Sequence, residues 1–228
     1  MQPTCSCTQC ELKTIFFESF KEIDYEAFCN QKIETNYAKG EIIIEQGSDI
    51  KDFMYLKSGL VKLYKTSSNK KDQIITIAKP FDFVSLLSVF STTKYNYSVM
   101  AIEDSVLCSM DLGFLQKGLL ESPLLSYNLL QKMSTVFDMI ISESLDIRER
   151  NLRGKLAYML LRFSNKIYFN DIFELPVSRR EIAEYIGATT ENVIRTFSEL
   201  RKDHIIRING KEIEIIDKDT LEKISRFG

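Results

Sequence analysis

The 228-residue chain has a single histidine, few glycines and no long apolar run, and each shortage excludes a class of protein. One histidine, His204, cannot build a Ser/His/Asp triad here, and the glycines form no phosphate-binding loop of the Walker or Rossmann type. We therefore expect that the protein is not an enzyme. The longest nearly apolar stretch, Phe83 to Phe90, is interrupted by serines and is far shorter than the roughly 18 residues that span a bilayer. We expect no membrane partner.

Secretion signals and a strong net charge are also lacking. The N-terminus has neither the basic start nor the apolar core of a secretory signal, so we expect a cytoplasmic protein. The net charge is −2, which gives the whole molecule no attraction to nucleic acid. The stretch from Arg148 to Lys166 is nevertheless locally basic, which suits either a solvated helix face or a contact with phosphates.

Short runs of β-branched and aromatic residues fill the part of the chain from Lys39 to about Asp111. Turns at Gly40, Gly47 and Gly59 separate several of these runs. Short strands without an intervening long helix predict a small antiparallel barrel or roll. The predicted strands are Ile42–Ile44, Phe53–Leu56, Leu60–Tyr64, Gln73–Ile77, Tyr97–Ile102 and Val106–Met110.

Helical spacing begins after Pro123 and predicts one long helix from about Pro123 to Arg150. A helix of this length exceeds the needs of a compact domain, and pairing with a second chain would bury its apolar stripe. We therefore expect a homodimer, although such a stripe also occurs in an ordinary core. Glu143 stands where the same stripe predicts an apolar residue. The predicted interface residues are Met133, Val136, Ile140 and Ile147.

A helix-turn-helix is predicted near the C-terminus. Ser178 and Glu181 have the spacing of a capping box, so a helix should begin at Arg179 and end at Gly187. Thr189 can cap a second helix, from Thr190 to about Lys202. An Asn209-Gly210 turn between two short strands completes the pattern of a winged helix-turn-helix, preceded by an amphipathic helix over residues 152–165.

The first turns of the second helix would face the major groove of double-stranded DNA. Arg195 can make two hydrogen bonds to guanine, and Glu191 can accept one from cytosine, so the two residues could read a G·C pair. The same spacing also suits an i,i+4 ion pair on a helix surface. Both interpretations fit the spacing.

The segment Val177 to Arg195 resembles the helix-turn-helix of the CRP/FNR regulators, and the resemblance continues through His204-Ile205-Ile206 and Gly210-Lys211. It implies an α+β chain: a cysteine-bearing segment (1–30), a β-roll sensor of the cyclic-nucleotide-binding type (31–122), a dimerisation helix (123–150) and a winged helix (151–228). It also implies a transcription regulator that binds DNA and RNA polymerase. Ile194 replaces a serine of the oxygen-sensing FNR branch, so the half-site should differ. The implied DNA-contact residues are Ser178, Arg179, Thr189, Thr190, Glu191, Ile194, Arg195 and Lys211.

The family's cyclic-nucleotide ligand is not expected here. The positions that hold ribose and phosphate correspond to Ser85-Leu86-Leu87 and Tyr95-Asn96-Tyr97, which lack the required Glu and Arg. Histidine-ligated haem is excluded because the sensor region has no histidine, although Cys or Met ligation is not. The protein should therefore respond to a signal other than cAMP.

The cysteines indicate which signal the protein senses. An odd total of five cysteines fits a disulfide framework poorly. Cys5, Cys7 and Cys10 supply three soft ligands, and Cys108 resembles the distant cysteine of FNR-type oxygen sensors, so we predict a redox-responsive 4Fe-4S cluster. The N-terminal gaps are narrower than in FNR, and Cys29 is either a core residue or a substitute ligand. Zinc, thiol redox sensing, haem, a small molecule, or a protein-interaction module without specific DNA binding are the alternatives.

Overall fold

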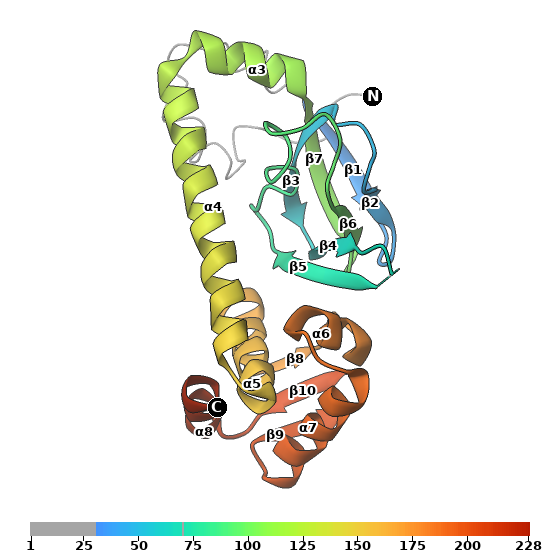
Figure 1. Cartoon of the computed structure of the whole chain (residues 1–228), viewed down its shortest axis with the longest axis vertical. Coiled ribbons are helices and arrows are strands. Elements are labelled where there is room, and N and C mark those ends of the chain that lie inside the picture. The colour runs from blue at the N-terminus through green and yellow to red at the C-terminus, as the bar shows by residue number, and fades with distance from the viewer. Residues whose placement is uncertain (1–30, 70) are drawn as a thin grey trace. The chain divides into compact units, whose positions relative to one another are not determined.

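The computed structural model describes residues 31–69 and 71–228. The chain divides into two compact units, one holding most residues up to Met139 and the other holding Ile140–Gly228 together with Asp72–Ile74. Figure 1 shows the elements of each unit. No helix in the described part of the chain is long and apolar enough to cross a membrane.

The first unit is built on two antiparallel sheets with strand orders β1-β7-β3 and β2-β6-β4-β5. Its core contains Leu56, Val61, Leu63, Val99 and Leu107, which are nearly or fully inaccessible to solvent. All six predicted strands are confirmed, and the sheets contain one further strand, β1, which was not predicted. The strands are β1 (Ile33–Tyr37), β2 (Ile42–Ile44), β3 (Asp52–Ser58), β4 (Val61–Thr66), β5 (Asp72–Ala78), β6 (Ser98–Ala101) and β7 (Ser105–Asp111).

Two helices follow the roll, α3 (Leu112–Glu121) and α4 (Pro123–Glu149). The Asp111 side chain caps α3 by accepting a 2.8 Å hydrogen bond from the Phe114 amide. The predicted long helix is confirmed as α4, whereas α3 was not predicted.

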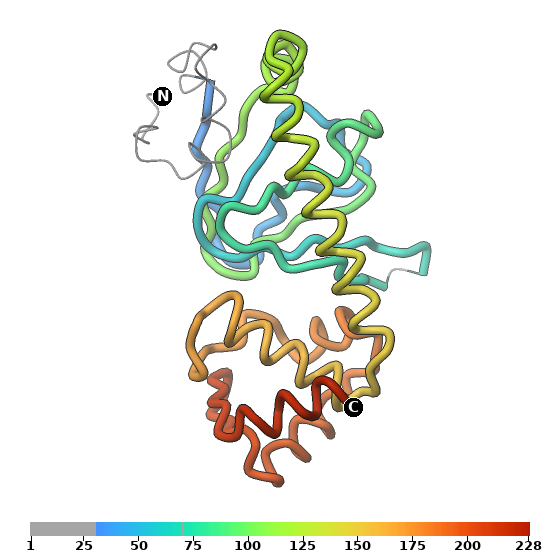
Figure 2. The backbone as a smooth tube through the Cα atoms, turned by 90° about the vertical axis from the view of Figure 1, so that its left-hand side faces the viewer, coloured from blue at the N-terminus to red at the C-terminus, as the bar shows by residue number. Residues whose placement is uncertain are grey.

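The second unit is a three-stranded sheet with helices around it. The predicted helix-turn-helix and hairpin are confirmed, and β8 and α8 are additional elements. Figure 2 traces α8 beside α5. Arg150, which lies between α4 and α5, donates a 2.6 Å hydrogen bond from Nε to the Ser225 carbonyl of α8. The elements are α5 (Leu152–Arg162), the π-helix η2 (Phe163–Tyr168), β8 (Ile172–Glu174), α6 (Arg179–Ile186), α7 (Thr190–Lys202), β9 (Ile206–Asn209), β10 (Glu212–Ile215) and α8 (Lys218–Phe227).

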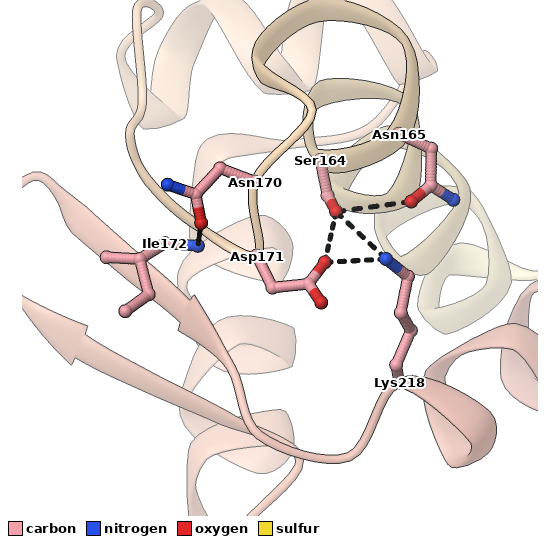
Figure 3. A network of polar contacts seen from close by, with 6 residues as sticks. All are labelled: Ser164, Asn165, Asn170, Asp171, Ile172 and Lys218. Carbon is pink, nitrogen blue, oxygen red and sulfur yellow. Dashed lines mark hydrogen bonds and ion pairs between the residues drawn. The ribbon is translucent and has the colours of Figure 1, made fainter.

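A polar network joins the first turn of η2 and the loop after η2 to the start of α8 (Figure 3). Lys218 Nζ lies 2.7 Å from Asp171 Oδ1, and the Ser164 hydroxyl donates to the same oxygen. These hydrogen bonds, from Lys218 first and then Ser164, lower the pKa of the Asp171 carboxyl. Asn170 adds a local turn by accepting a 3.0 Å hydrogen bond from the Ile172 amide. The network fixes the chain where it enters the sheet.

Candidate nucleic-acid interface and sensor

The helix-turn-helix is defined by local hydrogen bonds at both helix starts. Ser178 Oγ accepts from the Glu181 amide at 3.2 Å, and Glu181 Oε2 accepts from the Ser178 amide at 2.8 Å, which completes the predicted capping box. Gly187 ends α6 with φ of +68°, a conformation that glycine adopts without strain. Thr189 Oγ1 then caps α7 by accepting from the Asn192 amide at 3.3 Å.

Helix α7 has a buried face and an exposed face. Val193, Phe197 and Leu200 are buried, whereas Ile194 is 51% exposed and the Arg195 side chain 68% exposed. Glu191 lies exposed in the first turn, and Thr190 is half-buried beside it. Glu191, Ile194 and Arg195 therefore lie on the exposed face of α7, and Thr190 lies at its edge.

Arg195 has a different ion-pair partner from the one that its spacing suggested. Its Nε lies 3.8 Å from Glu199 Oε1, one turn further along α7. Both side chains are largely exposed, so this contact contributes little and breaks easily. The Arg195 guanidinium is thus available to another acceptor.

Arg179 combines a charge with a rigid position. Its Cζ lies 3.7 Å from the centre of the Phe197 ring, so a residue of α7 holds the first residue of α6. Partial burial lowers the pKa of the Arg179 guanidinium. Three other predicted contact residues, Ser178, Thr189 and Lys211, are exposed at a helix start or at the hairpin turn.

Helix α4 carries two apolar rows. Of the four predicted interface residues, Val136 and Ile147 are buried within the single chain, and Met133 and Ile140 are half-buried. This burial gives them a role inside the chain, and their part in a dimer stays a prediction. The second row is 38–60% exposed and consists of Tyr127, Leu130, Phe137, Ile141 and Leu145. Sequence periodicity showed that apolar residues recur on this helix but not which row the chain itself covers.

Comparisons with known proteins agree with this architecture. Residues 34–122 match the family "Cyclic nucleotide-binding domain", and residues 154–224 match "Crp-like helix-turn-helix domain". The "Probable transcriptional activator" of Rhizobium leguminosarum bv. viciae is 30% identical over 187 residues, which cover 80% of this chain and 77% of that protein. The "Anaerobic regulatory protein" of Bacillus subtilis is 25% identical over 199 residues, 85% of this chain and 84% of that protein.

The solved structure of FixK2 from Bradyrhizobium japonicum has the same fold, with a TM-score of 0.77 at 22% sequence identity, over 86% of this chain and 98% of that chain. The chain belongs to the CRP/FNR family of transcription regulators. Members of this family regulate transcription, so the expectation that the chain is not an enzyme is confirmed. Its Crp-like helix-turn-helix is a DNA-binding module.

The segment Tyr95–Tyr97 contacts the residue that directly precedes Ser85–Leu87. Tyr97 and Val84 are both buried, and the Tyr97 hydroxyl donates a 2.8 Å hydrogen bond to the Val84 carbonyl. Tyr95 packs edge-on against Tyr97, with ring centres 5.9 Å apart. Ser85 Oγ is occupied in a 2.9 Å hydrogen bond from the Met54 amide. The rings of Tyr95 and Tyr97 therefore belong to the core of the first unit.

Cys108 lies on β7 opposite Glu34 of β1 and Tyr55 of β3. Because Leu107 points into the core, Cys108 points to the other face of the sheet. Its thiol is buried and donates to Glu34 Oε1 at 3.7 Å, and Lys57 Nζ lies 2.6 Å from the same oxygen. The ammonium balances the carboxylate charge, so the surroundings of the thiol are not strongly anionic.

The other predicted cluster ligands, Cys5, Cys7 and Cys10, lie outside the described residues, as does Cys29. Within residues 31–69 and 71–228, no group of three or more His, Cys, Asp and Glu residues could hold a metal ion. Among the described residues, Cys108 supplies one soft ligand, whose thiol is buried, and a cluster site there would have to be completed by other cysteines of the chain. The remaining ligands of the predicted cluster would therefore have to come from the cysteines outside the described residues.

Proposed function

We propose that this CRP/FNR regulator binds a two-fold symmetric DNA site as a homodimer, with α7 of each protomer in the major groove. Glu191, Ile194 and Arg195 would contact base edges, while Arg179 and Lys211 would contact phosphates. The exposure of these base-reading residues on the first turns of α7, opposite its buried face, carries the proposal. Thr190 would lie beside the bases, and the exposed helix starts at Ser178 and Thr189 would point toward phosphates.

The exposed row of α4 supports a dimer. Its members recur at steps of three, four and seven residues, the spacing of a coiled-coil seam. Apolar side chains left this exposed on a long helix gain from burial against a second copy. We propose that the exposed row forms the dimer seam and that the half-buried and buried row stabilises α4 within the chain.

Selection of DNA from a random pool with the purified full-length protein tests this function. We expect a palindromic motif whose half-site spacing matches about one helical turn of DNA, and binding that weakens steeply with added salt. Enrichment of no motif, together with salt-insensitive or absent binding, would contradict it. Transcription from the selected site with purified RNA polymerase tests whether the polymerase is a partner. Because the proposed target is chromosomal DNA, we propose the cytoplasm as the location of the protein.

We further propose that Cys5, Cys7, Cys10 and Cys108 hold a 4Fe-4S cluster and that the regulator responds to oxygen or redox state, not to cAMP. The name of the Bacillus subtilis relative, "Anaerobic regulatory protein", supports such a signal. The 23 residues between Cys10 and Glu34 can span about 80 Å when extended, more than enough to reach Cys108. A bound 4Fe-4S cluster would supply oxygen-labile redox chemistry. The packed tyrosines at the nucleotide positions support independence from cAMP.

Anaerobic purification followed by absorption spectroscopy and iron analysis tests the cluster. The wild-type protein should be brown, contain about four iron atoms per chain and lose tight DNA binding in air. Cys108→Ser should remove colour and iron, whereas Cys29→Ser, the matched control, should keep both. Colourless protein whose DNA binding ignores oxygen would contradict the cluster and favour thiol or small-molecule sensing. Calorimetric titration with cAMP should give no heat of binding.

A further inference from the structure

A buried ionic cluster joins three helices of the Ile140–Gly228 unit. Glu143 of α4 is only 5% exposed, and its Oε1 lies 2.7 Å from Arg162 NH1 of α5. The hydroxyl of Tyr185, on α6, donates to the same carboxylate oxygen. Arg162 NH1 also donates to the Tyr185 hydroxyl at 2.5 Å, so the three side chains contact one another in a closed triangle. We call these three residues the latch.

Stability alone does not account for the latch. Removing a carboxylate and a guanidinium from water is costly, and apolar side chains of similar size usually stabilise a fold as well or better. Position 143 is also where the helical periodicity of α4 calls for an apolar residue. A buried, hydrogen-bonded triangle does specify the relative orientation of the three helices, because its hydrogen bonds form in only one arrangement of them. Burial raises the pKa of Tyr185, which keeps its hydroxyl a donor.

The latch acts on the helix that precedes the recognition helix. Tyr185 is followed by Ile186 and by Gly187, the residue that ends α6 before α7 begins. A second contact holds the same end of α6, since Lys155 Nζ of α5 donates a 3.2 Å hydrogen bond to the Ile186 carbonyl. Through the short turn to Thr189, the placement of α6 fixes the placement of α7.

We propose that Glu143, Arg162 and Tyr185 are positioning residues that fix the helix-turn-helix on the last turns of α4 and thereby set the half-site spacing that the dimer accepts. The proposal rests on the proposed function, because only a dimer paired through α4 can discriminate between different spacings of two DNA half-sites. The half-site spacing of a dimeric helix-turn-helix protein follows from the separation of its two recognition helices. An α6 free to tilt on α4 would let that separation vary.

A variant that loses the latch but leaves no unpaired buried charge provides the test. In the triple variant Glu143→Leu, Arg162→Leu, Tyr185→Phe, apolar groups fill the same volume. The full-length proteins are titrated against the selected palindrome and against copies with the spacer lengthened or shortened by one and two base pairs. Wild-type protein should reject the altered spacers roughly tenfold or more, and the triple variant should bind all spacings within about threefold. Tyr185→Phe alone should give an intermediate profile.

Tyr158→Phe is the matched control. Like Tyr185→Phe, this substitution removes one phenolic oxygen, but from Tyr158 of α5, whose ring centre lies 4.7 Å from the Arg150 guanidinium carbon. It should keep the wild-type spacing profile. A folded, dimeric triple variant that keeps the sharp profile overturns the proposal, as does a wild-type protein that binds the palindrome without spacing preference. Failure of the wild type to bind any palindrome would instead contradict the proposed function itself.

Discussion

Ile141→Glu places a carboxylate in the middle of the exposed row of α4. The Ile141 side chain is 57% exposed in the single chain, so a charged replacement should leave the fold of the protomer intact. In a symmetric dimer paired along this row, however, each interface would contain two carboxylates, one from each protomer. The substitution therefore separates assembly from folding.

The expected loss of dimerisation free energy has two parts. Fully burying an isoleucine is worth about 1.5–3 kcal/mol, so the 57% left exposed amounts to about 1–1.7 kcal/mol per protomer and about 2–3.4 kcal/mol per dimer. Desolvation of two unpaired carboxylates adds several kcal/mol more. A total of about 5 kcal/mol or more corresponds to a dimer dissociation constant at least roughly a thousandfold higher. At micromolar concentration the variant should be monomeric.

Light scattering measures the oligomeric state of Ile141→Glu, and circular dichroism checks that the variant is folded. The neighbouring substitution Ile140→Glu is the matched control, because Ile140 is half-buried within the chain. It should lower the free energy of unfolding by about 1–3 kcal/mol. Folded dimers of Ile141→Glu together with folded monomers of Ile140→Glu would refute the assignment of the seam to the exposed row and favour Met133, Val136, Ile140 and Ile147.

Three further predictions concern the DNA-binding unit. In gel shifts, Arg195→Ala should cost about 1–3 kcal/mol of binding free energy at the selected site and relax discrimination at one base pair. Arg179→Ala should weaken binding to all sequences alike. In thermal unfolding, Arg179→Ala should also lower the free energy of unfolding by about 0.5–1 kcal/mol, because the stack on Phe197 is lost. Asp171→Asn should cost less than about 1 kcal/mol because the side chains of Asp171 and Lys218 are partly exposed. Since the folded pKa of Asp171 is lowered, this difference should be present above about pH 4 and vanish as the pH falls through the folded pKa, measured by urea unfolding. Gly187→Ala should cost about 1–2 kcal/mol in thermal unfolding, from backbone strain alone, because a Cβ there would meet nothing within 4 Å.

Features set by local chemistry could be predicted from the sequence. The bounds of α7 follow from Thr189 as its cap and from the positive φ of Gly187 before it, and both signals lie within a few residues. The predicted strands between Ile42 and Met110 were found because β-branched runs alternate with turns. In each case the residues that make the structure are also neighbours along the chain.

Features set by distant partners could not be predicted. Ile33, Thr35 and Tyr37 of β1 favour a strand, but so short a segment was recognised only from its pairing with β7, in which Glu34 lies opposite Cys108. Glu143 was noted as an exception to the apolar stripe, but its partners Arg162 and Tyr185 lie on other helices. The two rows of α4 have the same periodicity, and only the fold decides which one the chain covers.

The charges of the DNA-binding unit explain why placement matters so much for this regulator. Four arginines of the unit, all partly or largely exposed, are each paired with a carboxylate: Arg153 with Asp203, Arg180 with Glu184, Arg195 with Glu199 and Arg207 with Glu214. Pairs of this kind weaken the unspecific attraction to phosphates, which depends on uncompensated positive charge. Affinity must then come from two recognition helices that reach their half-sites together, since joining two weak contacts raises the effective concentration of the second. Loss of the dimer seam should for this reason abolish selective binding, and loss of the latch should abolish the selection for half-site spacing, even though every DNA-contacting side chain remains in place.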